Sequence, residues 1–291
     1  LVASYRRFIA NLKEGGALVI CRQAYDVLHD AVEEIKDKVS VIVYGLDQET
    51  THTLGDGVDG EERGYGLDGY QARNIELMGP TARFDVYYNE TLLGECRISV
   101  PGVYNIENAL AAIAVARFAG LEFSQIFRVL TGFHGAHRRF EWVGMGDGIL
   151  VYDDYAHHPT EIQNTLQAAK VGFGRRLVAI FQPQRYSRTK LLMKEFGRSF
   201  KDADLVVITD IYAPPPETPL PGVTAERLAQ LIGEDIGEER VMYIGDKQRI
   251  PDALQPILQT NDLVITMGAG DVWQVAHAVA ERIQQRDVQG M

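Results

Sequence analysis

The stretch ILVYDDYAHHPTEIQNTLQAA, residues 149–169, decides the fold of the second half of the chain. Residues 149–152 form a short aliphatic and β-branched run that is typical of a buried strand. Residues 160–169 space their apolar side chains as an amphipathic helix does, and we expect Pro159 to begin this helix and Thr160 to cap it. The stretch therefore predicts a strand, a polar turn and a helix, the repeating unit of an α/β sheet.

The same unit recurs to the end of the chain. Each further β-branched run is followed by a helical pattern, and several of these patterns open with Thr or Asp near a Glu, as helix caps do. The predicted strands are residues 149–152, 177–181, 205–209, 241–244 and 263–266, and the predicted helices are 160–169, 189–200, 224–232, 250–258 and 272–283. The fold class is therefore α/β, with a doubly wound, mostly parallel, Rossmann-like sheet in the second half.

The first half follows a different pattern. Residues 17–21 and 41–44 resemble buried strands, whereas residues 72–99 alternate apolar and polar side chains around a turn at Asn89-Glu90, which predicts antiparallel pairing. Helices are expected at residues 106–119 and 124–130, the second capped by Ser124. Five glycines mark residues 132–148 as a hinge, so we divide the chain into residues 1–137 and 138–291.

Composition excludes several classes of partner. The 291 residues carry a net charge of −11 without any basic run interleaved with aromatics, so no nucleic acid is expected. No apolar stretch is long enough to cross a membrane, and no signal pattern opens the chain, which favours the cytoplasm. Cys21 and Cys96 lack the spacing of a disulfide framework or of a zinc site.

Unusual polar residues cluster where the predicted strands end, the edge at which open α/β sheets bind ligands. After the first strand, residues 153–161 place two carboxylates, a phenol and two imidazoles in one turn. A zinc site at His157-His158 is disfavoured, because adjacent side chains point apart and no third ligand follows at a recognisable spacing. Contact with a substrate or a nucleotide is the better interpretation.

Two further strand ends carry candidate ligand contacts. Arg185 and Arg188 open the helix after the second strand, where guanidinium groups can clamp a carboxylate or a phosphate, although a solvated basic helix start is the ordinary alternative. Residues 268–271, Gly-Ala-Gly-Asp, permit close backbone approach to a ligand. Trp273 stands where a dinucleotide fingerprint would need glycine, which argues against a nicotinamide-dependent oxidoreductase.

Asn105 and Asn108, three residues apart at the start of a helix, share one face and carry amides that can read an adenine edge. Helix capping explains Asn105, but Asn108 lies inside the helix, where asparagine is mildly unfavourable. In the segment between the two halves, Arg139 adds a cation that could reach a nucleotide.

Taken in order, these motifs resemble the Mur ligase family: residues 102–108 before an alanine-rich helix, Arg138-Arg139-Phe140-Glu141, and residues 153–161, 182–189 and 268–270. The double histidine and the Gln-Pro-x-Arg-Tyr-Ser-Arg-Thr run resemble the members that join L-alanine to UDP-N-acetylmuramate. The members that attach a recycled tripeptide to the same nucleotide sugar share Asp-x-Ala-His-His-Pro-Thr and are the alternative. Gln184, where the alanine enzymes often have histidine, departs from the pattern.

The resemblance implies a role for each candidate residue. Asn105 and Asn108 would contact the adenine of ATP, and Arg139 and Asp154 its ribose or phosphates. Tyr155, His157 and Arg188 would line the amino acid pocket, and Arg185 would support this pocket or a phosphate. Arg139, Asp154 and His157 would lie nearest the reacting atoms. None of them is implied as a metal ligand.

The implied reaction uses ATP and Mg²⁺ to phosphorylate the muramyl carboxylate, which the amine of L-alanine then attacks to form an amide. The resemblance makes residues 1–137 part of a phosphate-loop type ATP-binding central domain and residues 138–291 the Rossmann-like domain that follows it. The loop Gly-x-x-x-x-Gly-Lys-[Ser/Thr] is absent from the sequence, however. Family members carry it, the UDP-binding domain and the magnesium ligands upstream, so this chain is expected to be inactive alone, and a noncatalytic nucleotide-binding module is a further alternative.

Overall fold

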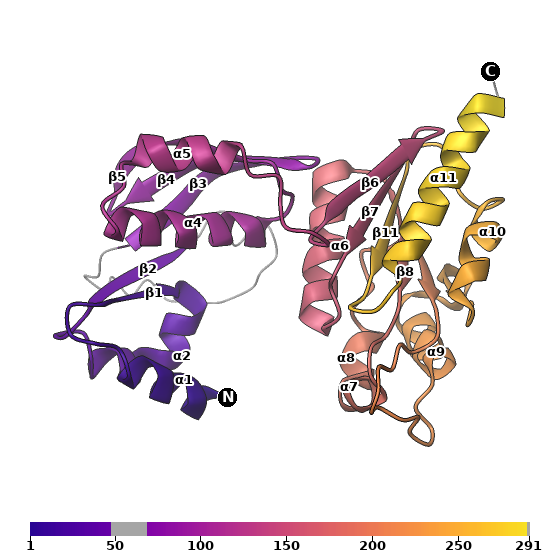
Figure 1. Cartoon of the computed structure of the whole chain (residues 1–291), viewed down its shortest axis with the longest axis horizontal. Coiled ribbons are helices and arrows are strands. Elements are labelled where there is room, and N and C mark those ends of the chain that lie inside the picture. Colours follow the sequence, from indigo (N-terminus) through magenta and orange to yellow (C-terminus); the bar gives the residue numbers. More distant parts are fainter. Residues whose placement is uncertain (48–68, 290–291) are drawn as a thin grey trace. The chain divides into compact units, whose positions relative to one another are not determined.

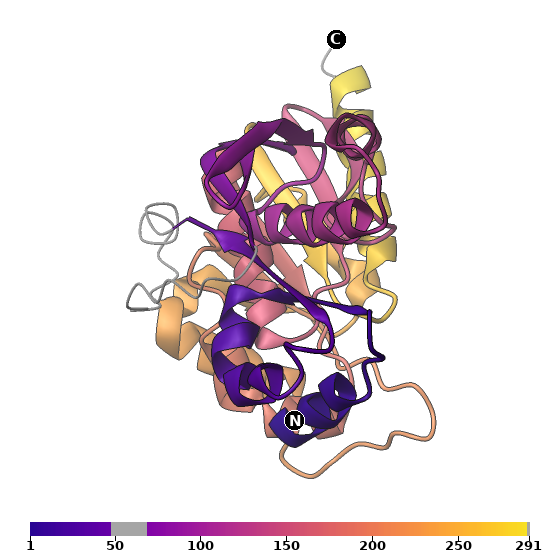
Figure 2. The ribbon, with the colours of Figure 1, turned by 90° about the vertical axis from the view of Figure 1, so that its left-hand side faces the viewer.

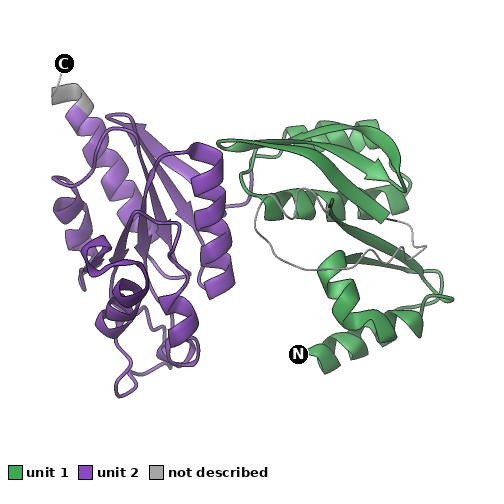
Figure 3. Cartoon of the chain, turned by 180° about the vertical axis from the view of Figure 1, so that it is seen from behind, with its two compact units in different colours: residues 1–134 green, residues 135–291 purple. Residues whose placement is uncertain are grey.

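The computed structural model describes residues 1–47 and 69–289. The chain divides into two compact units, Leu1–His134 and Gly135–Met291, which Figure 3 shows in separate colours. The division falls close to the boundary expected from the glycine-rich segment.

Unit 1 alternates helices with strands at first and then continues as a meander (Figure 1). Its described elements are α1 (Val2–Ala10), β1 (Ala17–Cys21), α2 (Arg22–Glu33), β2 (Ser40–Leu46), β3 (Gly69–Met78), β4 (Thr81–Tyr88), β5 (Thr91–Ile98), α4 (Val103–Phe118) and α5 (Phe123–Thr131). The predicted strands at residues 17–21 and 41–44 are confirmed as β1 and the centre of β2.

The five described strands of unit 1 form one sheet in the order β1-β2-β3-β4-β5. Strands β1, β2 and β3 pair in parallel, and β3, β4 and β5 pair antiparallel, as the alternating pattern predicted. The turn at Asn89-Glu90 is confirmed, with left-handed φ values of 45° and 64°. The pattern did not predict a second turn after Met78, which separates β3 from β4.

Both faces of β1 and β2 are covered by helices. Leu18, Ile20 and Val41 face a core made with α2, whereas Ile42 faces a core made with α4, because successive strand residues point to opposite faces. Helices α1 and α2 lie side by side (Figures 1 and 2).

Two predicted caps in unit 1 are wrong. Helix α5 begins at Phe123, one residue before Ser124, and the amide N–H of Glu122 donates to the Gln125 side chain at 2.9 Å. Helix α4 begins at Val103 after Gly102, so Asn105 lies inside the helix. Its Nδ2 donates to the carbonyl oxygen of Pro101 at 2.7 Å, and it therefore caps no helical N–H.

Unit 2 contains the predicted run of strands and helices. Its elements are β6 (Glu141–Gly146), β7 (Ile149–Asp154), α6 (Pro159–Phe173), β8 (Arg176–Phe181), α7 (Tyr186–Leu191), α8 (Met193–Gly197), β9 (Leu205–Ile208), α9 (Ala225–Ile236), η1 (Glu238–Arg240), β10 (Val241–Tyr243), η2 (Lys247–Arg249), α10 (Ile250–Leu254), β11 (Asp262–Met267) and α11 (Trp273–Gln289). All five predicted strands are confirmed.

The sheet of unit 2 has the order β10-β9-β8-β11-β7-β6, parallel throughout except for the antiparallel edge strand β6. One face packs against α10 and α11 through Ile250, Leu254 and Val275. On the other face Phe181 lies 5.5 Å, between ring centroids, from both Phe196 and Phe200. Helices on both faces define the doubly wound fold that the sequence predicted.

Part of the glycine-rich segment proposed as a hinge belongs to the sheet of unit 2. Gly144 and Gly146 lie in β6, against α11. A Cβ at Gly146 would meet the backbone of Ile283 and Gln284 at 2.7 Å, which no real side chain tolerates. These glycines therefore serve close packing of a helix on a strand.

Two helix starts differ from the prediction. The N-cap of α6 is His158, whose Nδ1 accepts from the Thr160 amide at 3.4 Å, and Thr160 lies within the helix. The helix expected over residues 189–200 is two short helices, α7 and α8, which meet at Leu192. Among the described residues no helix is both long and apolar enough to cross a membrane.

Candidate functional site

The polar residues singled out in unit 2 meet at one edge of its sheet. Strand β11 lies between β7 and β8, and its last residue, Met267, is in register with Asp154 of β7 and Phe181 of β8. The turns that follow these three strands are therefore neighbours at the carboxyl edge, where open α/β sheets bind ligands.

Asp154 is buried at this edge and holds two turns together. Its Oδ1 accepts from the Ala156 amide and its Oδ2 from the Phe140 amide, both at 2.7 Å. Burial raises the pKa of this carboxyl to about 6, against the opposing effect of the two amides and of Arg139. Asp154 is only 3% exposed. Its bond to the Ala156 amide fixes the turn after β7, so the residue has a structural role at this edge.

The guanidinium of Arg138 holds the same edge together from the other side. Its Nε donates to Asp153 Oδ2 at 2.8 Å, while Nη1 and Nη2 donate to the carbonyl oxygens of Gly270 and Gly268 at 2.9 and 2.6 Å. Asp153 also accepts from Thr266 at 2.6 Å. This pair of charges is nearly buried, and the additional hydrogen bonds to the two carbonyl oxygens and from Thr266 offset the cost of removing it from water.

Arg139, Tyr155 and His157 form a second group, in which Arg139 is exposed and Tyr155 and His157 are half-buried. The guanidinium carbons of Arg138 and Arg139 lie 5.2 and 5.5 Å from the centroid of the Tyr155 ring, within cation–π range. His157 Nδ1 lies 2.8 Å from the Tyr155 carbonyl oxygen, which can only accept, so a neutral ring carries its proton on Nδ1. Its Nε2 then has a lone pair that can take a proton.

The end of β8 is tied to the turn after β11. Gln182 Nε2 donates to Asp271 Oδ1 and Gln182 Oε1 accepts from the Asp271 amide, both at 3.0 Å. Burial raises the pKa of Asp271, but hydrogen bonds from Lys247 and Gln182 outweigh it and hold that pKa below its ordinary value. Gly270 packs so closely on Gln182 and Tyr212 that a Cβ would clash.

Arg185 and Arg188 project from the start of α7. Arg185 is the N-cap, with a left-handed φ of 68°, and its side chain is exposed. Arg188 is half-buried and donates to Gln184 Oε1 at 2.9 Å. Glu217 accepts from the Ser187 amide, and this hydrogen bond, assisted by Arg185 and Arg188, lowers the pKa of the Glu217 carboxyl. Both cations therefore stand near enough to the Glu217 carboxylate to stabilise its charge.

The two candidate asparagines lie in unit 1, on the first turns of α4. Asn108 is exposed, and its Nδ2 lies 3.3 Å from Asn105 Oδ1. Their amides face each other across one helix surface, as the spacing predicted, and Asn105 is further anchored to Pro101.

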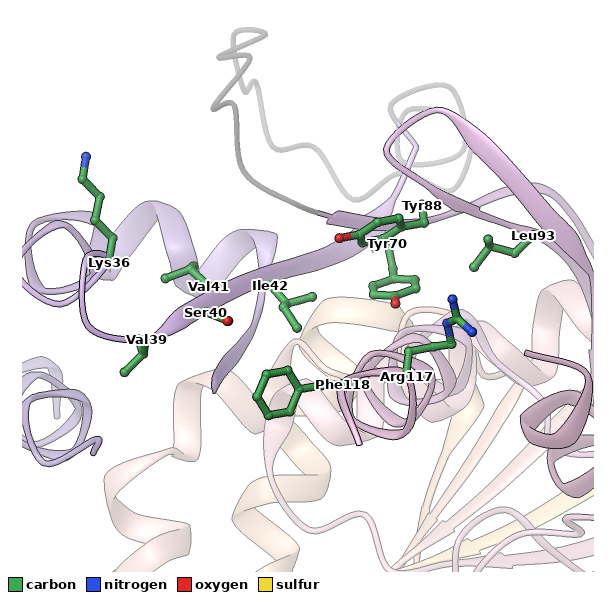
Figure 4. A pocket seen from close by; sticks show the side chains of 10 residues that line it. All are labelled: Lys36, Val39, Ser40, Val41, Ile42, Tyr70, Tyr88, Leu93, Arg117 and Phe118. Atoms are coloured by element: carbon green, nitrogen blue, oxygen red, sulfur yellow. The ribbon is translucent and has the colours of Figure 1, made fainter. Parts of the chain in front are cut away.

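Unit 1 also contains a cavity of about 430 Å³ (Figure 4). It is lined by Ser40 at the start of β2 and by Arg117 and Phe118 at the end of α4, together with Lys36 and Tyr70. Because Asn105 and Asn108 stand at the opposite end of α4, the cavity is separate from these two side chains.

The described residues offer no evident metal centre. In residues 1–47 and 69–289 no three His, Cys, Asp or Glu side chains gather into a cluster that could hold a metal ion.

Sequence reasoning missed three contributors to this edge: the Arg138 clamp, the Gln182–Asp271 pair and Lys247. Arg138 and Gln182 stood in quoted motifs, but only pairing in space distinguishes a clamp from a ligand contact. Lys247 follows β10 outside any motif, and no sequence signal marked it.

The family described as "Mur ligase, glutamate ligase domain" matches residues 138–270. These residues form a Mur ligase C-terminal domain, and curated relatives match most of the chain. Among its relatives, the UDP-N-acetylmuramate–L-alanine ligase of Symbiobacterium thermophilum is 41% identical over 287 residues, covering 98% of this chain and 55% of the relative. That of Geotalea uraniireducens is 46% identical over 223 residues, covering 76% and 48%. The chain thus spans about half the length of the curated relatives it matches.

Solved structures agree in fold. The UDP-N-acetylmuramate-alanine ligase of Thermotoga maritima matches with a TM-score of 0.65 and 26% identity, over 90% of this chain and 55% of that one. A murein peptide ligase from Psychrobacter arcticus gives a TM-score of 0.59 at 22% identity, over 97% and 54%, a likeness that shows the fold alone.

Proposed function

We propose that the chain is part of an ATP-dependent ligase of peptidoglycan precursor synthesis that joins L-alanine to UDP-N-acetylmuramate in the cytoplasm. One observation carries the proposal. In a Mur ligase C-terminal domain, the exposed cation Arg139 stands beside Tyr155 and His157 at the carboxyl edge of the sheet, and Arg185 and Arg188 stand at the same edge. Cations and hydrogen-bonding groups so placed suit a carboxylate and a polyphosphate.

On the nucleotide side, we assign Asn105 and Asn108 to the adenine and Arg139 to the phosphates. Asn108 in unit 1 and Arg139 in unit 2 are both exposed, so each side chain is open to a ligand on its own unit. Both carboxylate oxygens of Asp154 accept hydrogen bonds from backbone amides. Any contact to the ribose would therefore use the remaining lone pairs of these oxygens. Its main role in this proposal is to hold the Arg139 segment against the turn after β7.

On the amino acid side, we assign the alanine carboxylate to Arg188, supported by Arg185, and the walls of the pocket to Tyr155 and His157. A guanidinium holds a carboxylate bidentately and so orients the attached amine. His157 Nε2 could accept the proton that the amine loses on attack. Bound ATP would supply the phosphoryl group that activates the sugar carboxylate, and no metal-binding role is assigned to the described residues.

Isothermal titration calorimetry on the chain tests the assigned nucleotide and amino acid contacts separately. We expect weak binding of ATP that Asn108→Ala weakens, and weak binding of L-alanine that Arg188→Ala weakens by about tenfold or more, since a hydrogen bond to a charged group contributes about 1.5–3 kcal/mol. Arg227→Ala on α9, which removes an exposed arginine far along the chain, is the matched control and should change neither affinity.

The decisive assay uses the complete protein, with the remainder of the relatives' length present. ATP-dependent joining of L-alanine to UDP-N-acetylmuramate, measured as ADP release, should fall in Arg139→Ala and Arg188→Ala. Undiminished ligation in both variants would refute the residue assignments, and no ligation by the unmutated protein would refute the function.

The alternative substrate is a tripeptide in place of L-alanine. The run Asp154 to Thr160 resembles the recycling ligases as well as the alanine enzymes, so it does not separate the two substrates. Glu161 and the run from Arg185 to Thr189 favour the alanine enzyme. Offering both acceptors to the complete protein decides between them, and nucleotide binding without either ligation would indicate a noncatalytic module.

A further inference from the structure

We propose that Arg138 is a positioning residue for the ligation reaction. It would touch no ligand itself, but would hold Arg139, Tyr155 and the Gly268–Gly270 turn in the arrangement that the reaction uses. This inference rests on the proposed function. It assigns a separate role to each of two adjacent arginines, the first internal and the second facing the ligand.

Each of the three guanidinium nitrogens of Arg138 donates a hydrogen bond within unit 2. Its three donating nitrogens reach Asp153, Gly268 and Gly270 at 2.6 to 2.9 Å, and 12% of the side chain is exposed. By contrast, no hydrogen bond of the Arg139 side chain occurs among the described residues, and Arg139 is exposed. Arg139 is therefore available to bind a ligand, whereas Arg138 is not.

The backbone of Arg138 is fixed as firmly as its side chain. Its amide donates to Glu141 Oε2 and its carbonyl oxygen accepts from the Tyr155 amide, both at 2.7 Å. Arg138 and Phe140 have left-handed φ values of 58° and 48°, a conformation that costs a non-glycine residue energy and persists where surrounding contacts enforce it. Arg139 lies between these two residues, so their fixed backbone sets the direction in which the Arg139 side chain points.

The turn after β11 needs such an anchor because it is rich in glycine. Gly268 has a φ of 149°, and a peptide flanked by glycines can rotate at little cost, since glycine accepts both signs of φ. Arg138 draws the carbonyl oxygens of Gly268 and Gly270 to its own side. The planar trans peptides then turn their N–H groups the opposite way, and that of Asp271 reaches Gln182.

Unit 2 provides its own control at the other edge of the same sheet. Arg176, at the start of β8, donates from Nη1 to Asp262 Oδ2 at 3.0 Å and to the Ile257 carbonyl oxygen at 3.3 Å. Asp262, like Asp153, is nearly fully buried. The two pairs share their chemistry, but Arg138 stands at the carboxyl edge and Arg176 at the amino edge.

The test compares Arg138→Met with Arg176→Met in the complete protein. Both variants should lower the thermal midpoint, but Arg138→Met should lower kcat/KM for L-alanine by about 100-fold, the effect of misplacing groups by about 1 Å. Arg176→Met should leave that value within about threefold. Arg138→Lys should recover part of the loss, because a lysine keeps the charge beside Asp153 but lacks the planar fork that reaches the carboxylate and both carbonyl oxygens at once. Equal kinetic losses in the two Met variants would overturn the proposal, and if Arg138→Met does not fold, Arg138→Lys takes its place in the comparison.

A second measurement is independent of the reaction. In amide NMR spectra of the chain, Arg138→Met should shift the signals of Tyr155, Ala269 and Asp271, whereas Arg176→Met should leave them in place. Unchanged signals would overturn the positioning role even if ligation falls. Shifted signals in a complete protein that carries out no ligation would instead locate the failure in the proposed function.

Discussion

The carboxyl of Asp154 should make the stability of unit 2 depend on pH in an unusual direction. Burial raises its pKa to about 6 in the folded chain, against an ordinary value of 3.8. A raised pKa means that the folded state binds the proton more tightly than the unfolded state does. The stability from this group is therefore fully present below about pH 3.8 and is lost as pH rises through about 6.

The size of the effect follows from the two pKa values. Each pKa unit corresponds to about 1.4 kcal/mol, so the ionised carboxyl costs unit 2 about 3 kcal/mol at neutral pH relative to its protonated form. Asp154→Asn cannot ionise and should remove this pH dependence. It also sets an amide donor against the N–H of Phe140 or Ala156, so its stability should be lower by about 1–3 kcal/mol in a manner independent of pH.

Tryptophan fluorescence gives a readout confined to unit 2, because both tryptophans of the chain, Trp142 and Trp273, lie there. Urea unfolding between pH 3.5 and 7.5 should show a component of the pH slope that Asp154→Asn abolishes. The control Asp235→Asn, an exposed carboxylate on α9, should retain it. A carboxyl ¹³C signal assigned to Asp154 that titrates at pH 4 or below would refute the reasoning, as would an unchanged slope in Asp154→Asn.

Three further changes test the packing and the hydrogen bonds of unit 2. Gly146→Ala should cost about 1–3 kcal/mol in urea unfolding, since its Cβ would press on α11; an unaltered midpoint would mean that the helix yields freely. Phe140→Ala should cost about 3–5 kcal/mol, because this ring packs against Tyr152 and Phe173 at 5.0 and 5.9 Å between centroids. The hydrogen bond to Asp210 raises the pKa of Tyr243 to about 12, so Tyr243→Phe should remove a phenol from the last step of an absorbance titration; loss of a phenol titrating near pH 10 would contradict it.

The strands of unit 2 could be predicted because they are buried on both faces. A strand between two helical layers must be apolar at nearly every position, so runs such as Leu177 to Phe181 stand out without any periodicity. Strand β6 was missed because its inward positions are Gly144 and Gly146. Glycine indicates a turn in sequence, and only the close approach of α11 explains it here.

Helix starts were predicted less well, because several residues compete for each cap. Before α6, both His158 and Thr160 can accept a backbone N–H, and Pro159 between them sets the first helical residue. Glu161 completes the cap by accepting from the amides of His157 and His158 at 2.9 and 3.1 Å. The sequence shows which residues could cap this helix, but the backbone conformation before the helix determines which of them does.

The motifs at the carboxyl edge divide by burial into residues that build the edge and residues that remain open to a ligand. Asp153, Asp154 and Gln182 are at most 4% exposed and bond to the chain itself. Arg139 and Arg185 are exposed at the same edge. A buried charge left without a partner would be too costly, so the polar residues that shape the edge must satisfy one another before a ligand arrives. A motif shared with a family therefore contains both residues that shape the edge and residues that can contact a ligand. Substitution of a buried residue should reduce ligand binding only indirectly, by displacing the exposed residues.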